Sequence, residues 1–521
     1  MTAQEEQRGQ SLKSTPETSV GTPSSPKGTP ARKPQGNDRV ARMGTASLPR
    51  LITEFAIPAI LGMLVNAAYN LIDSIFLGQA MGEIGLSAAT VAAPLMIVFM
   101  ALAMLVGNGG NALAALRLGQ GRRDAAETAL GNTVSLAIIL SVAIAIIVNI
   151  PPCMEALLTI SSATATDAIH DWTRTYLWII SMGVIFQIIG MGVNNFIRTA
   201  GAPNRALLTM VVGAVGCICF NYLFVMVLGF GIPGSAAATL CGQALSFVSV
   251  LWYFVKTPNV PIKLRRRCMK LHGAVVKDIL TLGLASFLLQ IAACISTTVV
   301  NMQLVKYGAL SPLGAENALA ALGVVNRLAG IAIMPIIGVS IAAQPLLGFN
   351  YGAGLIPRVR KTVGFAILYA CIIGTLLWLI TRLWPVQIVG LFGVRNELMD
   401  LTVFALQVQM LFVPIVGLQV ITSNYFQATG QPFKSSVLSL TRQILFLIPA
   451  MFLTPIVGPM VFPGMDGLNA LFMSWPIADF LAIFTSSGFL LWELRRLKRI
   501  ERGEVTDKFV GGTKPQQAAA E

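Results

Sequence analysis

Long apolar segments alternate with short polar loops along almost the whole chain. A helix that crosses the hydrocarbon core of a bilayer needs about 20 mostly apolar residues, and each segment meets this length. The segments cover about residues 51–77, 86–117, 126–150, 170–199, 206–229, 233–256, 275–306, 317–349, 359–382, 397–428, 433–456 and 464–494. Several exceed one membrane thickness, so we expect them to tilt or kink. The pattern predicts an all-α membrane protein with about twelve transmembrane helices.

Composition and charge agree with this class. Of the 521 residues, 55% are hydrophobic and 12% are charged, and the mean hydropathy is +0.71. The net charge of +14 comes from Lys and Arg in alternate short loops, whereas the loops at 79–85, 151–171, 229–234 and 457–467 contain neither. Cytoplasmic loops carry this basic bias. We therefore expect a multi-pass protein of the plasma (inner) membrane, in contact with lipids and not with nucleic acid, with both termini cytoplasmic.

Polar stretches divide the chain into five parts. Residues 1–45 are rich in Ser, Thr, Pro and Gly, and this composition predicts a disordered cytoplasmic tail. A basic linker, residues 257–274, separates an N-terminal six-helix lobe (46–256) from a C-terminal six-helix lobe (275–494), and 495–521 form a second cytoplasmic tail. The seven cysteines show neither a disulfide framework nor a metal spacing.

The two lobes resemble each other in sequence, at a separation of about 230 residues. The three matching pairs are Asn194–Pro203 with Ser423–Pro432, Leu86–Leu95 with Leu319–Leu328, and Gly231–Ala238 with Pro463–Ala470. Three matches in register indicate an internal duplication of a six-helix unit in parallel orientation. Duplicated bundles bind substrate between their halves and work by rocking one half against the other, so we expect alternating access by a monomer.

Asp73 lies near the end of the first apolar segment, fifteen residues after Pro58. An ionised Asp at the middle of a membrane helix costs about 2.5–3.5 kcal/mol, so it calls for a partner, a wet cavity or a bound ion. We predict that Asp73 binds the coupling ion, although a carboxylate that reaches the outer interface is the alternative. Pro58 removes a helical hydrogen bond and predicts a hinge in the first helix.

The duplication points to further polar candidates. Asn195 in the N-terminal lobe matches Asn424 in the C-terminal lobe, and Asp73 aligns with Asn301, so a titratable group occurs on one side only. Asp479 is the other acid within a predicted span. It is either functional or a packing carboxylate that is hydrogen-bonded to a neighbour.

These motifs resemble the multidrug and toxic compound extrusion (MATE) family of antiporters over about residues 48–495. The resemblance rests on Pro58 and Asp73 in the context Tyr-Asn-Leu-Ile-Asp-Ser-Ile-Phe-Leu-Gly, on the Gln120-Gly and Tyr351-Gly loops, and on the paired loops at Gly201 and Gly430. It is most similar to the bacterial branch whose coupling acid lies in the N-terminal lobe. In that family the matching Asp binds a proton or sodium ion, and the matching proline is where the first helix bends.

The resemblance also implies a polar cavity in the N-terminal lobe. Tyr69 matches a tyrosine near the coupling acid, and Asn221 and Thr239 match polar residues of the same lobe. The chain departs from the family pattern at Val225, where relatives usually carry a second acid, and at Gln290 and Ala293, where sodium-type relatives carry a glutamate. The resemblance implies efflux of small molecules, lipophilic cations in particular, by antiport with protons or, less in keeping with a single carboxylate, sodium. No cofactor beyond that ion and no metal site is expected.

Three other functions are weighed against this one. A flippase for a lipid-linked sugar would share the duplicated bundle but needs several basic residues for a diphosphate; the spans offer Arg174, Arg198, Lys306, Arg327 and Arg442, and Arg198 is expected to reach the interface. An enzyme would need a nucleophile with its base, or metal ligands, and the two histidines lie at helix ends. A passive channel could also use one Asp.

Overall fold

The computed structural model describes residues 36–161, 167–311, 314–394, 397–463 and 466–511. All regular elements in these ranges are helices, which confirms the predicted all-α class. Ten helices are long and apolar enough to cross a membrane, and two pairs of shorter helices, each joined at a bend, bring the total to as many as twelve. The predicted number of spans is therefore confirmed.

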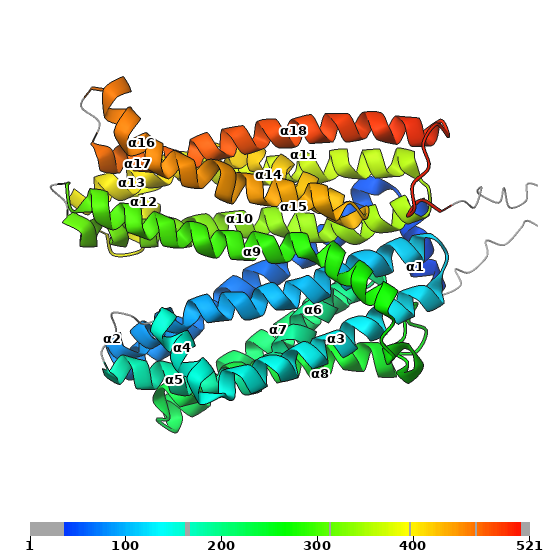
Figure 1. Cartoon of the computed structure of the whole chain (residues 1–521), viewed down its shortest axis with the longest axis horizontal. Helices are drawn as coiled ribbons and strands as arrows, with labels where there is room; N and C mark the ends of the chain where they lie inside the picture. The colour runs from blue at the N-terminus through cyan, green and yellow to red at the C-terminus, as the bar shows by residue number, and fades with distance from the viewer. Residues whose placement is uncertain (1–35, 162–166, 312–313, 395–396, 464–465, 512–521) are drawn as a thin grey trace, which may run out of the picture. The chain divides into compact units, whose positions relative to one another are not determined.

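The first six spans form one bundle, the lower half of the molecule in Figure 1. Its elements are α2 (Leu48–Gly119), α3 (Arg123–Asn149), α4 (Pro151–Ser161), α5 (Asp167–Met182), α6 (Val184–Thr199), α7 (Pro203–Asn221), the π-helical segment η1 (Tyr222–Val227) and α8 (Gly231–Lys256). The long helix α2 contains two spans, Leu48–Asp73 and Ala92–Gly119.

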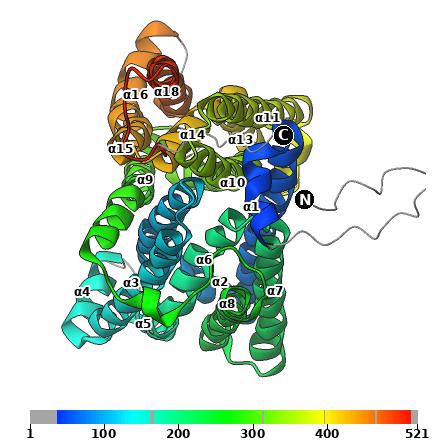
Figure 2. The same cartoon turned by 90° about the vertical axis from the view of Figure 1, so that its right-hand side faces the viewer.

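The last six spans form the second bundle, which lies beside the first in both views (Figures 1 and 2). Its elements are α9 (Gly273–Gly308), α10 (Gly314–Gly352), α11 (Ile356–Leu383), α12 (Pro385–Gly390), α13 (Glu397–Gln409), α14 (Val413–Ala428), α15 (Pro432–Leu440), the π-helical segment η3 (Thr441–Leu447), α16 (Ile448–Val461), α17 (Gly467–Phe472) and α18 (Ser474–Glu501). Between the bundles, residues 257–272 include the short 3-10 helix η2 (Arg266–Met269) and pack against α3, where Asn132 Nδ2 donates to the carbonyl oxygens of Cys268 and Lys270.

One span in each bundle is bent, the first at a glycine packed against another helix and the second at a proline. The helices α5 and α6 meet at 55° at Gly183, and α13 and α14 meet at 47°. Gly183 lies so close to Leu240 that an added Cβ would be 1.9 Å from Leu240 Cδ2. In the other span, Pro414 stands in the first turn of α14, where its missing N–H and its ring interrupt the ladder from the preceding helix.

The duplication is visible in matching local geometry. Gly201 ends the turn after α6 with φ +77°, and Gly430 ends the turn after α14 with φ +81°, a conformation that glycine adopts without strain. Each glycine is followed two residues later by the proline that begins the next helix. The contacts repeat as well: Asn194 Nδ2 donates to the carbonyl oxygen of the residue twelve positions later at 3.1 Å, and Ser423 Oγ does the same at 3.4 Å. The two halves therefore share their internal packing.

The bundles touch through backbone. A Cβ added at Gly109 in α2 would lie 2.0 Å from the carbonyl oxygen of Ile279 in α9, and one at Gly283 would lie 1.7 Å from that of Leu105. Ordinary van der Waals contact begins at 3.4 Å. Only glycine permits this approach, which brings the second span of α2 against α9 directly.

The helix α1 (Gly36–Thr45) shows that the tail predicted at residues 1–45 ends earlier than expected. Met43 is 1% exposed, and its carbonyl oxygen accepts hydrogen bonds from Asn350 Nδ2 at 3.2 Å and Arg358 at 3.3 Å. Residues 36–45 therefore belong to the folded unit, because their apolar side chains and backbone are engaged by the second bundle. Residues 1–35 lie outside the described part.

The second tail, predicted at 495–521, is likewise folded as far as it is described. The helix α18 continues to Glu501, and residues 502–511, which we call the C-terminal segment, return to the protein at the end of the molecule that carries α1. We call this end the termini face. Gln120 Nε2 of α2's cap donates to the carbonyl oxygen of Phe509 at 2.9 Å, and the N–H of Gly511 donates to that of Gly352 at 2.9 Å.

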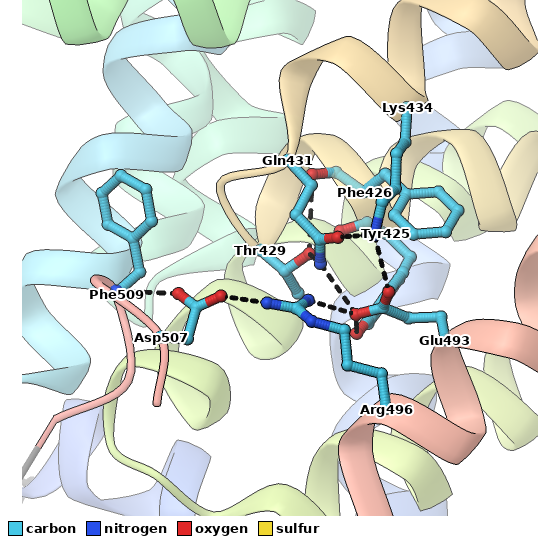
Figure 3. A network of polar contacts seen from close by, with 9 residues as sticks. All are labelled: Tyr425, Phe426, Thr429, Gln431, Lys434, Glu493, Arg496, Asp507 and Phe509. Atoms are coloured by element: carbon cyan, nitrogen blue, oxygen red, sulfur yellow. Dashed lines mark hydrogen bonds and ion pairs between the residues drawn. The ribbon is translucent and has the colours of Figure 1, made fainter. Parts of the chain in front are cut away.

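A polar network anchors the C-terminal segment (Figure 3). At its centre the side chain of Glu493 is fully buried and forms ion pairs with Lys434 at 3.0 Å and Arg496 at 2.8 Å. Arg496 also pairs with Asp507, whose carboxylate accepts a hydrogen bond from the N–H of Phe509 at 2.9 Å. Together with the hydrogen bond from Gln120 of α2, this network joins the C-terminal segment to both bundles.

Candidate functional site

The carboxylate of Asp73 lies where three helices meet. Asp73 ends the first span of α2, Asn221 is the last residue of α7, and Ser235 lies near the start of α8. Asn221 Nδ2 donates to Asp73 Oδ1 at 2.8 Å, and Ser235 Oγ donates to the same oxygen at 3.2 Å. Asn221 is 1% exposed and Ser235 is fully buried. These neutral donors fix the orientation of the carboxylate without neutralising its charge.

Charge compensation at Asp73 is incomplete. The ion pairs between described residues do not include this carboxylate. An ionised carboxylate in apolar surroundings is costly unless a cation or a proton compensates it. The amide oxygen of Asn221 is buried and has no hydrogen-bond partner among the described residues. A proton-bearing or cationic group beside Asp73 would find this acceptor free.

Two more of the predicted residues are one helical turn from this cluster. Tyr69 precedes Asp73 by four positions on α2, and Thr239 follows Ser235 by four positions on α8, so each shares a helix face with its neighbour. Ser235 was not among the predicted site residues. The signal was available, because Ser235 lies in the repeated segment Gly231–Ala238 one turn before Thr239.

Asn195 belongs to a different polar chain, which crosses between the bundles. Its Nδ2 donates to Asn108 Oδ1 at 3.0 Å, and Asn108 Nδ2 donates to Ser286 Oγ of α9 at 3.0 Å. Arg198 donates to Asn195 Oδ1 and is only 2% exposed, so the expectation that it reaches the membrane interface is wrong. Its guanidinium also donates through Nη2 to Met210 Sδ at 3.5 Å.

The three candidate residues of the second lobe, Asn301, Asn424 and Asp479, do not form one site. Asn424 Nδ2 donates to the carbonyl oxygen of Ser340 at 2.6 Å, a contact that joins α14 to α10. Asn301 is exposed on α9. Asp479 is buried and forms an ion pair with Arg442 at 2.7 Å. Arg442 was predicted only as a basic residue within a span, because nothing in the sequence pattern pairs it with Asp479.

Pro58 is buried in the first span of α2. Close contacts surround the following turn: a Cβ added at Gly338 of α10 would lie 2.8 Å from Ile60 Cα, and one at Gly62 would lie 2.8 Å from Met210 Sδ. Any bend at Pro58 therefore has to move α2 along both α10 and α7. The described residues contain no group of three or more His, Cys, Asp or Glu side chains that could hold a metal ion.

A family model described as MatE matches residues 58–223 and 287–453. The chain belongs to the MatE family. The two matched ranges fall in the first and the second bundle, as a duplicated unit requires. Members of this family are membrane transporters and not enzymes.

Relatives and solved structures of this family cover most of the chain. Multidrug export protein MepA of Staphylococcus haemolyticus is 22% identical over 466 residues, which is 89% of this chain and 97% of the relative. MepA of Staphylococcus aureus strain MSSA476 is also 22% identical, over 84% of this chain and 96% of its own length. A structure described as the outward-facing conformation of a multidrug resistance MATE family transporter shares 24% identity, with a TM-score of 0.80, over 88% of this chain and 98% of that one. A MATE structure in the bent conformation has a TM-score of 0.79 at 24% identity, over 90% and 99%.

Proposed function

We propose that this MatE-family protein is a secondary multidrug exporter that exchanges protons for lipophilic cationic compounds at the plasma membrane. The observation that carries the proposal is the Asp73 carboxylate, held by Asn221 and Ser235 and lacking a basic partner among the described residues. The relatives named as multidrug export proteins support the substrate class. The basic loops of the termini face support cytoplasmic termini.

The exchange follows from charge. When Asp73 is ionised, the first bundle accommodates one positive charge, either on a substrate or on a coupling ion. Protonation of Asp73 neutralises the carboxylate, so the site no longer stabilises a cation and the cation is released. Pro58, fifteen residues before Asp73 on the same span, then permits the first helix to bend and to change the cavity that faces the substrate. We propose a proton as the coupling ion because Asp73 is the one carboxylate of this cluster, and a proton needs no further oxygen ligands.

Flipping of a lipid-linked sugar stays an alternative hypothesis. It requires free basic groups for a diphosphate. Two of the arginines available to it are engaged: Arg174 pairs with Glu155 at 3.3 Å, and Arg442 pairs with Asp479. This weakens the case for a phosphate-binding cavity and favours the export of cations.

The test is substrate-induced proton release from the purified protein at low buffer strength. The wild type should release protons when a lipophilic cation is added, and Asp73→Asn, which keeps the shape of the protonated side chain, should release none while folding normally. Asp400→Asn changes an exposed carboxylate in the same way and should behave like the wild type. Proton release by Asp73→Asn at the wild-type level would refute the coupling role. Proteoliposomes with an imposed proton or sodium gradient then identify the coupling ion.

A further inference from the structure

A cavity of about 190 Å³ lies inside the second bundle, away from Asp73. It is lined by residues of α9, α10, α13, η3 and α18. Its wall contains one complete ion pair, formed by Arg442 Nε and Asp479 Oδ1 at 2.7 Å. The side chain of Asp479 is 4% exposed and that of Arg442 is 24% exposed. The arginine therefore offers part of its guanidinium to the cavity while the carboxylate stays within the wall.

Local backbone geometry presents Arg442 to this space. Arg442 lies in the π-helical segment η3, and such segments occur frequently at functional sites because they interrupt the regular helical ladder. The interruption is compensated from α9, where Ser296 Oγ donates to the carbonyl oxygen of Gln443 at 3.0 Å. Both Ser296 and Gln443 line the cavity.

The wall also has unused hydrogen-bonding capacity. Within the described part of the chain, the two terminal nitrogens of Arg442 and the second oxygen of Asp479 have no hydrogen-bond partner. The amide oxygen of Gln409 is buried and is also without a partner there. Buried polar atoms in native structures are nearly always paired, so the unpaired Gln409 oxygen beside this partly used ion pair points to a ligand.

The net charge of the cavity wall indicates which charge the ligand carries. The pair of Arg442 and Asp479 is neutral as a unit, and the cost of burying an unbalanced charge is high. A cation alone would leave the occupied cavity with one excess positive charge, and an anion alone would leave it with one excess negative charge. A molecule with one carboxylate and one ammonium group leaves the site neutral and satisfies both kinds of unused atom.

We propose that this cavity binds a small zwitterion, with its carboxylate on the terminal nitrogens of Arg442 and its ammonium group between Asp479 and Gln409. Trp475, whose side chain lines the same cavity, supplies a surface for an apolar or aromatic group. The volume is below the range of about 300–1,000 Å³ that holds drug-sized ligands, so the expected ligand has the size of an amino acid. This inference goes beyond proton-coupled export of cations, since it assigns a second site of different charge preference.

The proposal is tested by calorimetric titration of the purified full-length protein, without any ion gradient, with three probes that share one skeleton. The probes are L-phenylalanine, phenethylamine, which lacks the carboxylate, and hydrocinnamate, which lacks the ammonium group. Each lost charged hydrogen-bonding group should weaken binding roughly tenfold to 100-fold. Equal affinities for all three probes, or no binding of phenylalanine, would overturn the proposal whatever the outcome of the proton-release test at Asp73.

Three variants test the assignment of groups. Arg442→Met should lose the preference for phenylalanine over phenethylamine, and Asp479→Asn should lose its preference over hydrocinnamate. Gln409→Leu leaves the ion pair intact, so it should fold even where the charged variants do not, and it should weaken binding of both amine-bearing probes. Arg382→Met, which removes an arginine that bonds Gln407 outside the cavity, is the matched control and should bind like the wild type. Unchanged affinities for both amine-bearing probes in Gln409→Leu would refute the ammonium site at Gln409, and unchanged affinity ratios in Arg442→Met and Asp479→Asn would show that the ion pair is structural only.

Discussion

Replacement of Gly283 by alanine tests whether contact between the bundles controls the transport cycle. The added Cβ would lie 1.7 Å from the carbonyl oxygen of Leu105, which is half of the 3.4 Å at which ordinary contact begins. The obstacle is backbone and has no other rotamer, so α2 and α9 must separate by about the missing 1.7 Å. Overpacking of this kind costs about 1–3 kcal/mol. If only the conformation with touching bundles bears that cost, its population relative to the separated one falls about five- to 150-fold.

The assay is a distance measurement between spin labels at Arg122 and Lys361, one on each bundle at the termini face, in a background without the native cysteines. Gly283→Ala should shift the distance distribution toward longer values and slow transport. Gly330→Ala makes the same change in α10, where nothing lies within 4 Å of the added Cβ, and should leave both unchanged. An unaltered distribution in Gly283→Ala with wild-type transport would refute the idea that this contact must open and close.

Three further predictions concern topology, the N-terminal region and the hinge. In intact cells an impermeant maleimide should label Leu391→Cys, at a loop residue that is 84% exposed, but should label Lys361→Cys only after lysis; the opposite result would invert the topology. Deletion of the residues before Gly36 should leave the melting temperature and transport unchanged. Deletion through Met43 should lower the free energy of unfolding by about 2–5 kcal/mol, because a buried side chain is lost. Equal melting temperatures for the two deletions would contradict this. Pro58→Ala should lower the transport rate more than substrate affinity, and an unchanged rate would argue against a hinge.

The number and order of the helices could be predicted because each membrane span depends on the residues of its own segment. Each span is a continuous apolar run, and each boundary carries a charge, a glycine or a proline. The same holds for the duplication, since Gly201 and Gly430 stand at turns that demand a positive φ and are followed by a helix-starting proline. The bends were harder to place. Gly183 is at a break because Leu240, 57 positions later in the chain, packs against it.

The candidate site was predictable only in part. Asp73 stands out because a carboxylate in an apolar run is costly, and Asn221 was reached through family resemblance. Ser235 and Arg442 were not assigned as partners of Asp73 and Asp479, because these pairings depend on how separate helices are rotated and not on any spacing along one of them. The same limit applies to Met43, whose burial comes from contacts with residues about 300 positions later.

The C-terminal segment has a consequence for how the protein is made. Residues 502–511 leave the ribosome after both bundles, and the contacts of Phe509 with Gln120 and with Gly430 can form only when those bundles are already packed. Docking of the segment is therefore a late event in biogenesis. A chain interrupted before Asp507 would insert all of its spans but would lack the contacts that Phe509 makes with Gln120 and Gly430, so the two bundles would not be joined by this segment.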